Sequence, residues 1–240
     1  MRSLFATITV ILLLAANTAP VRAAEEQHEQ QSPDKPETSK ASSKLNPIKE
    51  SDANSPVMIP VMLPIPGKNY EIGKYEVTQA EWRSVMGNNP SKFGNCGDDC
   101  PVEKVSWDDA QAYIQKLNAR TGRQYRLPTE AEWEFACYGG IQSTYCGGND
   151  VDKVAWTDDK GNEQTHPVGQ KQANGYGLYD MSGNVMEWTS DCPNGDCSRR
   201  VFRGGSWINS PRDARVSYRI KFIPSIRNGS GGFRLARTIP

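Results

Sequence analysis

Apolar residues divide the chain into three stretches. Phe5 to Ala16 form an apolar run, whereas residues 25–54 contain Leu45 and Ile48 as their only large aliphatic residues and no aromatic residue. All six tryptophans lie beyond residue 80. A segment this poor in apolar residues cannot offset the entropy lost on ordering. The pattern therefore predicts a disordered linker over residues 25–54 and one folded domain over residues 55–240, which agrees with a usual size of about 100–200 residues per domain.

Capping patterns within the domain predict three helices. In each, a Ser or Thr oxygen accepts a hydrogen bond from the amide three residues on, and the acid at that position accepts one from the cap residue's own amide. The pairs are Thr78 with Glu81, Ser106 with Asp109, and Thr129 with Glu132. The first helix is expected over residues 79–86, the second up to Gly122, and the third from just after Pro128 to near Gly139.

The chain beyond residue 140 is expected to hold little regular structure, because Gly, Asn, Asp and Trp dominate it and β-like runs such as Arg200–Arg203 are short. A domain of this kind needs braces other than long helices and sheets. Disulfides, buried tryptophans and a bound ion are the available candidates.

The N-terminus has the pattern of a secretory signal over residues 1–24. Arg2 supplies the positive start, the apolar run follows, and Val21 to Ala23 offer a cleavage site. Spanning a bilayer takes about 20 apolar residues, so a cleaved signal is favoured over an uncleaved anchor. We therefore expect a periplasmic or secreted protein.

Charge excludes some partners. The chain has 28 basic and 28 acidic residues, and no Lys/Arg cluster that would attract a phosphate backbone. No stretch after the signal is long and apolar enough to enter a membrane. We therefore expect neither nucleic-acid binding nor membrane insertion. We expect a protein or peptide partner in the periplasm instead.

The six cysteines are expected to form disulfides, because exported thiols are usually paired. Sequence proximity favours three local pairs, although six cysteines allow 15 connectivities. A zinc site is the alternative that the spacing leaves open. The favoured pairs are Cys96 with Cys100, Cys137 with Cys146, and Cys192 with Cys197.

A candidate cation site lies between Asp180 and Glu187, which bracket the Gly183–Asn184 turn. Calcium binds several oxygens at about 2.3–2.6 Å, and a turn lets side-chain carboxylates join backbone carbonyls. The spacing alone is weak support, because acids near a turn are usually only solvated.

An ordered set of motifs along residues 60–238 resembles the formylglycine-generating enzyme family, also called sulfatase-modifying factors. Several linked motifs in one order are a specific signal. The motifs are Gly73–Thr78, Pro101–Trp107, Arg126–Glu134, His166–Gly169, Gly177–Asp180, Gly183–Val185, Arg203–Trp207 and Gly232–Arg234.

The resemblance implies one compact α+β domain of the C-type-lectin-like kind with low regular secondary structure. It also implies a calcium ion held by the side chains of Asp180 and Glu187 and by the carbonyls of Gly183 and Val185. A second family calcium site falls around Val154 and Lys160, whose side chains do not suit it, and it is not expected here.

The family's enzyme holds copper with two cysteines and oxidises a sulfatase cysteine to formylglycine. Counted from Ser206, these positions fall on Asn209 and Ala214, and no cysteine follows Cys197. Thiolates suit Cu(I), so their replacement removes the metal site, and copper is not expected. A pocket aromatic of the family is also replaced, by Met186.

Two functions follow from these replacements. The first is a calcium-braced binding or accessory domain of the cell envelope without copper-dependent oxidase activity. The alternative is a diverged oxidoreductase or maturation enzyme that acts on an exported peptide or protein with the same pocket. Its candidate residues are Ser206, Asn209, Arg212, Asp213 and Arg215. Their structural interpretation is a polar loop with its arginines paired to local acids.

Overall fold

The computed structural model describes residues 56–158 and 163–239. They fall within a single compact unit, Ile48–Pro240. The expected signal over residues 1–24 and all of the expected linker over residues 25–54 belong to the part that the structure does not describe, so both stay predictions.

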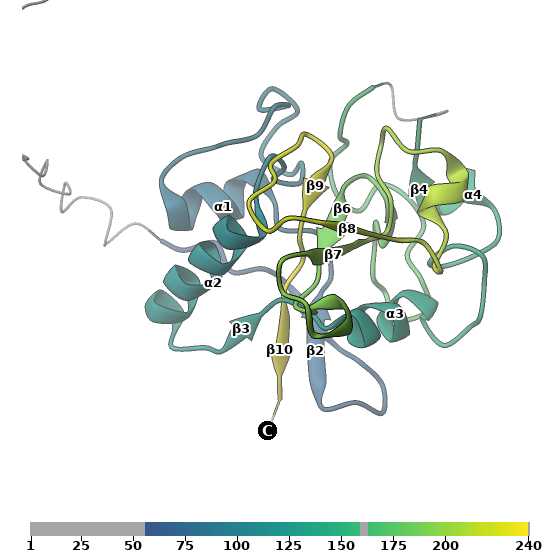
Figure 1. Cartoon of the computed structure of the whole chain (residues 1–240), viewed down its shortest axis with the longest axis horizontal. Coiled ribbons are helices and arrows are strands. Elements are labelled where there is room, and N and C mark those ends of the chain that lie inside the picture. Colours follow the sequence, from purple (N-terminus) through teal and green to yellow (C-terminus); the bar gives the residue numbers. More distant parts are fainter. Residues whose placement is uncertain (1–55, 159–162, 240) are drawn as a thin grey trace, which may run out of the picture. The chain divides into compact units, whose positions relative to one another are not determined.

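The three expected helices are present with their expected caps (Figure 1). They are α1 (Gln79–Met86), α2 (Trp107–Thr121) and α3 (Glu130–Tyr138). Each begins with a complete capping box and ends at a glycine in the left-handed region. The prediction succeeds because both signals are local, lying within the first and last turns. A fourth, one-turn helix is α4 (Val151–Val154).

Strands are short and form three small sheets. The first has the order β1-β2-β10-β3, all antiparallel, and the second has the order β8-β7-β6-β9. Their strands are β1 (Met62–Pro64), β2 (Tyr70–Gly73), β3 (Tyr125–Arg126), β10 (Ala236–Thr238), β6 (Met186–Trp188), β7 (Arg200–Arg203), β8 (Arg219–Phe222) and β9 (Gly231–Gly232). The two-stranded parallel sheet pairs β4 (Ala155–Trp156) with β5 (Ser182–Gly183). This low content of regular structure matches the expected fold class.

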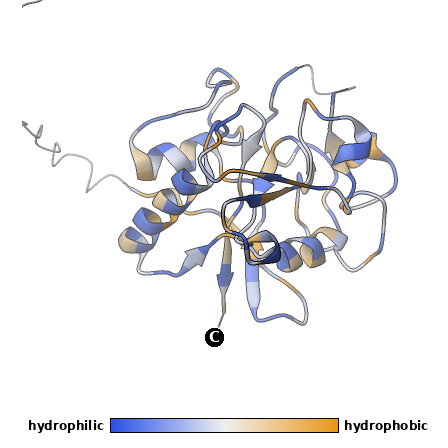
Figure 2. Cartoon of the chain, viewed as in Figure 1, coloured by the Kyte–Doolittle hydropathy of each residue, from blue (hydrophilic) through white to orange (hydrophobic). Residues whose placement is uncertain are grey.

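Two hydrophobic clusters make up most of the core. One lies beneath α1 and α2 and includes Trp82 and Trp188; the other lies beneath α3 and includes Trp133. The helices carry apolar and polar residues side by side along their length (Figure 2), as expected for helices that bury one stripe. Tryptophans therefore brace the core, although Trp107 and Trp156 are only partly buried.

The three favoured cysteine pairs are confirmed as disulfides: Cys96–Cys100, Cys137–Cys146 and Cys192–Cys197. All six cysteines of the chain are therefore used, and the zinc alternative is wrong. Each bridge closes a loop of four to nine residues, which is why proximity in sequence predicted the pairing.

Among the described residues, no helix has the length and apolar character needed to cross a membrane.

Candidate functional site

The first part of the site is residues 180–187, which we call the calcium segment. Its backbone turns sharply, with positive φ at Asp180 (55°), Gly183 (80°) and Asn184 (57°). Asp and Asn tolerate this conformation better than most side chains, and Gly183 has no room for one because an added Cβ would lie 2.3 Å from the Trp156 carbonyl oxygen. The sequence of the turn is thus dictated by its backbone.

Glu187 lies at the end of this segment and is fully buried. Its Oε2 accepts hydrogen bonds from Trp133 Nε1 (2.7 Å) and Arg234 Nε (2.6 Å), and its Oε1 accepts one from Arg234 Nη2 (2.6 Å). A buried carboxylate needs such partners. Oε1 keeps capacity for one more interaction, because a carboxylate oxygen has two lone pairs.

Asp180 is buried as well, but only one of its oxygens is satisfied. Oδ2 accepts a hydrogen bond from the Gly169 amide (2.7 Å), whereas Oδ1 has no partner among the described residues. Burial raises the pKa of Asp180 to about 6, against the lowering effect of the Gly169 amide and Arg234. A buried carboxylate oxygen without a donor is the kind of atom that a cation would satisfy.

Glu76 belongs to the same cluster, and sequence reasoning missed it. Its two oxygens accept hydrogen bonds from Asn184 Nδ2 (2.7 Å) and the Val185 amide (2.9 Å), so it holds the calcium segment from outside. Burial and the neighbouring Asp180 and Glu187 raise its pKa well above the usual range. The only signal in the sequence was an acid between Tyr75 and Val77, within a family motif that lies between β2 and α1.

Charge in this cluster is unbalanced. Three buried carboxylates, those of Glu76, Asp180 and Glu187, share one buried guanidinium, Arg234. Within the described ranges, no three His, Cys, Asp or Glu side chains are placed to hold a metal together. A calcium ion would therefore depend on Asp180 Oδ1, backbone carbonyls and the spare capacity of Glu187. The expected ligand set of Asp180, Gly183, Val185 and Glu187 stays a prediction.

The second part of the site is residues 206–215, which we call the Ser206 loop. Ser206 is buried, and its Oγ donates to Asn209 Oδ1 (2.6 Å), while the Asn209 carbonyl accepts from the Asp158 amide (3.0 Å). Ala214 is fully buried, and its carbonyl accepts from Ser182 Oγ (2.7 Å). The two positions where the family carries cysteines are thus held by hydrogen bonds.

The other candidates in the Ser206 loop point elsewhere. Asp213 accepts from Ser210 Oγ (3.1 Å) at the start of a short 3-10 helix. Arg212 and Arg215 are exposed, and neither forms an ion pair with a described residue. The interpretation that these arginines pair with local acids is therefore wrong. Ile208 is 56% exposed, so the loop presents an apolar side chain as well as two exposed cations.

The backbone of the loop explains its glycine pair. Gly205 has φ of 69°, and a Cβ there would lie 2.6 Å from the Asp213 carbonyl oxygen. The amide of Gly183 donates to the Gly204 carbonyl, which joins this loop's base to the calcium segment. Met186, at the former aromatic position, is buried in the core cluster beneath α1 and α2.

A fold of small sheets and capped helices, with a buried acidic segment beside a Gly-Gly-Ser loop, defines the formylglycine-generating-enzyme-like class. Residues 40–239 match the family model described as the sulfatase-modifying factor enzyme 1-like domain. The chain belongs to this family.

Relatives of the chain within this family carry names that describe different functions. The chain is 36% identical over 230 residues to the chaperone protein LppX of Paenibacillus barcinonensis, covering 71% of this chain and 80% of that protein. It is 37% identical over 179 residues to the inactive C-alpha-formylglycine-generating enzyme 2 of Bos taurus. That match covers 67% of this chain and 57% of the relative, so the chain spans little more than half of it.

Solved structures support the same fold. Variable protein 1 of Treponema denticola superposes with a TM-score of 0.65 at 30% identity, over 76% of this chain and 93% of that one. PvdO from Pseudomonas aeruginosa superposes with a TM-score of 0.60 at 26% identity, over 75% and 91% of the two chains.

Proposed function

We propose that this protein is an exported, calcium-braced binding or accessory domain of the cell envelope, which recognises a protein or peptide partner and does not oxidise cysteine with copper. The observation that carries the proposal is the state of the sulfur atoms. All six cysteines are committed to disulfides, and the family's two copper positions are Asn209, hydrogen-bonded to Ser206, and the buried Ala214. The chain has no thiolate to offer to Cu(I).

Calcium has a structural role in this proposal. Asp180 and Glu187, with the carbonyls of Gly183 and Val185, would hold it, and the ion would supply the positive charge that the buried carboxylates lack. Bound calcium would stabilise the folded state only, because the ligands converge only after folding. Glu76 would position the segment through its hydrogen bonds to Asn184 and Val185.

Three disulfides support an oxidising compartment such as the periplasm or the cell exterior. Two relatives, one named as a chaperone and the other as an inactive enzyme, agree with a role other than catalysis. The exposed face of the Ser206 loop, with Ile208, Arg212 and Arg215, is the surface that we assign to the partner.

Elemental analysis of the purified protein tests the metal half of the proposal. We expect about one calcium per chain and no copper after incubation with Cu(I). A parallel assay offers a sulfatase peptide that carries the target cysteine. Copper at one per chain, or conversion of the cysteine to formylglycine, would overturn the proposal.

Crosslinking in the cell envelope tests the binding half. The wild-type protein is compared with a variant that combines Ile208→Asp, Arg212→Glu and Arg215→Glu. We expect one adduct that the variant loses while its disulfides and thermal unfolding are retained. Adducts that are identical in both proteins would exclude the Ser206 loop as the partner surface.

The second candidate function is a diverged maturation enzyme that uses the same loop. The hydrogen bond between buried Ser206 and Asn209 is the observation in its favour, because it orients two polar groups in a loop that also carries exposed arginines. Asn209→Ala with Asp213→Ala would then abolish the ability of the gene to complement its own deletion. Full complementation by this variant would dispose of the enzymatic function.

A further inference from the structure

A cavity of about 520 Å³ opens along α3, lined by residues that belong to neither loop of the candidate site. Five of its six lining residues are on α3, and the sixth, Asp191, follows β6. Positions 130, 134 and 138 recur every four residues, and so do positions 131 and 135, so they share one face of the helix. The lining residues are Glu130, Ala131, Glu134, Phe135, Tyr138 and Asp191.

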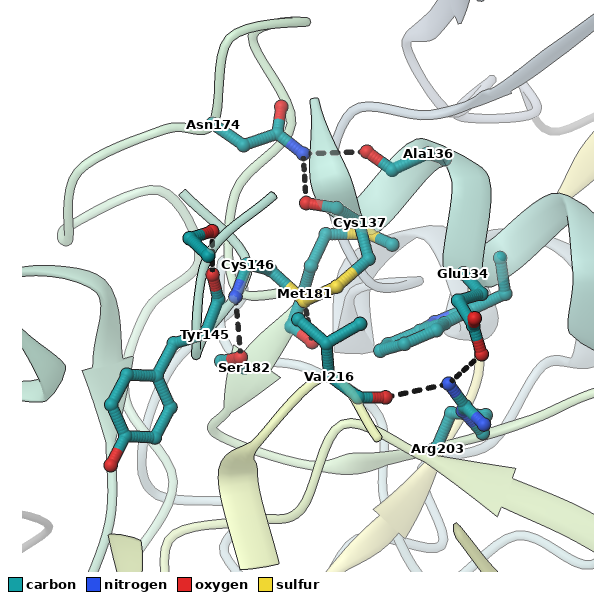
Figure 3. Close-up of a disulfide and its surroundings, with 12 residues drawn as sticks. Glu134, Ala136, Cys137, Tyr145, Cys146, Asn174, Met181, Ser182, Arg203 and Val216 are labelled. Atoms are coloured by element: carbon teal, nitrogen blue, oxygen red, sulfur yellow. Dashed lines mark hydrogen bonds and ion pairs between the residues drawn. A yellow bond between two sulfur atoms is a disulfide. The ribbon is translucent and has the colours of Figure 1, made fainter. Parts of the chain in front are cut away.

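The walls of this cavity are fixed at both ends of α3. At the start, Asp191 Oδ2 accepts from the Glu130 amide (2.5 Å). At the end, the Cys137–Cys146 disulfide and Asn174, whose Nδ2 donates to the carbonyls of Ala136 (2.7 Å) and Cys137 (3.1 Å), hold the last turn (Figure 3). A ligand would therefore meet a preformed surface and lose little free energy in ordering it.

The acids of the cavity differ in how far they are satisfied. Glu130 binds both Arg203 and Arg219 through its two oxygens. Glu134 uses only Oε2, toward Arg203 (2.8 Å), as Figure 3 shows, and Asp191 uses only Oδ2. Within the described residues, Glu134 Oε1 and Asp191 Oδ1 accept no hydrogen bond. Two acceptor oxygens in the lining of the cavity thus carry no hydrogen bond, and Arg219 is the described cation that interacts electrostatically with both acids.

Aromatic surface lies beside these oxygens. Phe135 is 36% exposed although it is a large apolar residue, and Tyr138 is half-buried. The ring of Phe135 already attracts a cation, because Lys68 Nζ lies 4.2 Å from its centroid. Free carboxylate oxygens next to an exposed aromatic ring suit a guanidinium, which is planar, stacks on rings and donates in several directions.

A second cavity of about 200 Å³ shares Tyr138 with the first. Its lining is uncharged and includes Ile141, Ser143 and Asn149. Ile141 is 71% exposed. An extended peptide could place one side chain in each cavity, with Tyr138 between them.

We infer that the α3 cavity binds an arginine side chain of a partner peptide, with an uncharged neighbouring residue in the second cavity. The guanidinium lies between Glu134 and Asp191 and against the Phe135 ring. This site is separate from the proposed calcium segment and Ser206 loop, and it specifies the chemistry of one partner contact.

Titration with acetyl-Arg-Ala-amide, followed by amide chemical shifts of the full chain, tests the inference. The matched probe is acetyl-citrulline-Ala-amide, which has the same shape without the charge. We expect saturable shifts at residues 130–138 and 191 with a dissociation constant on the order of 1 mM for the arginine probe, and at least roughly ten-fold weaker binding of the citrulline probe.

Variants of the walls sharpen the result. Glu134→Gln with Asp191→Asn should weaken the arginine probe roughly ten-fold, because the side-chain oxygen left at position 191 still accepts from the Glu130 amide while both charges are lost. Lys68→Met should tighten it, since a competing cation leaves the ring. Asp108→Asn, at an exposed acid of α2, is the control and should change nothing.

Equal binding of the two probes would overturn the inference, as would the absence of saturable shifts up to about 10 mM. Unchanged binding by the double variant, with its circular dichroism like the wild type, would overturn it too. Elemental analysis is not affected by any of these outcomes, so failure here is distinguishable from failure of the calcium proposal.

Discussion

The calcium segment and the Ser206 loop are neighbours in the fold, joined by the Ser182 to Ala214 hydrogen bond. They differ in the family feature that they retain, which is side-chain chemistry in the first and backbone conformation in the second. The calcium segment keeps side-chain chemistry, with Asp180 and Glu187 buried and one oxygen unsatisfied among the described residues. The Ser206 loop keeps its backbone, with Gly205 where no side chain fits, and has no sulfur. A backbone that the fold requires can persist without the chemistry that relatives position on it.

The largest effect is expected from breaking the buried ion pair between Arg234 and Glu187 of the calcium segment. Arg234→Met should lower the free energy of unfolding by about 3–5 kcal/mol, because it leaves Glu187 buried without its partner. Chemical denaturation measures the change. Arg227→Met is the matched control: Arg227 pairs with Asp109 but is 52% exposed, so its loss should cost at most about 1 kcal/mol. Equal effects of the two substitutions would refute the role given to burial.

Calcium removal is expected to have the second-largest effect. At about one hundred times its dissociation constant, calcium should add about 2.7 kcal/mol to the stability of the wild type, and chelation should remove it. Asp180→Asn should abolish this response, whereas Asp108→Asn, on an exposed face, should keep it. Thermal unfolding with and without chelator gives the answer. A wild-type protein whose unfolding is indifferent to calcium would contradict the proposed role of the segment.

The backbone of the Ser206 loop is tested by Gly205→Ala. A Cβ at this position meets the Asp213 carbonyl at 2.6 Å in a left-handed conformation, so we expect about 1–3 kcal/mol of destabilisation. Gly195→Ala has a similar φ of 79° and nothing within 4 Å, and should cost about 1 kcal/mol. Denaturation midpoints that do not separate the two variants would show that the loop can relax.

The smallest expected effect is at the exposed side of the same loop. Arg212→Ala should change stability by less than about 0.5 kcal/mol, because the side chain is exposed and pairs with no described residue. If this substitution proved strongly destabilising in urea, the arginine would have a structural partner after all, and the loop could not be the free surface that we assign to the partner.

Features that depend on residues close together in the sequence were predicted, whereas features that depend on residues far apart in the sequence were not. Helices and disulfides were predicted because the residues that define them, such as Thr78 and Glu81 or Cys192 and Cys197, lie within a few positions of each other. The cluster around Glu76 was not predicted, because its hydrogen bonds to Asn184 and Val185 cross 108 and 109 residues and leave no local pattern. The α3 cavity was not predicted either: five of its lining residues lie on one helix, but the rest of the fold decides which side of that helix stays open, and Asp191 joins it from beyond the calcium segment.

The first sheet carries a consequence for how this domain is made. Strand β10 is an inner strand, bonded to β2 on one side and β3 on the other, and Arg234 just before it supplies the only buried guanidinium at Glu187 among the described residues. Neither the first sheet nor that ion pair can form until residues 234–238 reach β2, β3 and Glu187. Shortening the chain by a few C-terminal residues should therefore leave a product that proteases clear, rather than a slightly weaker domain.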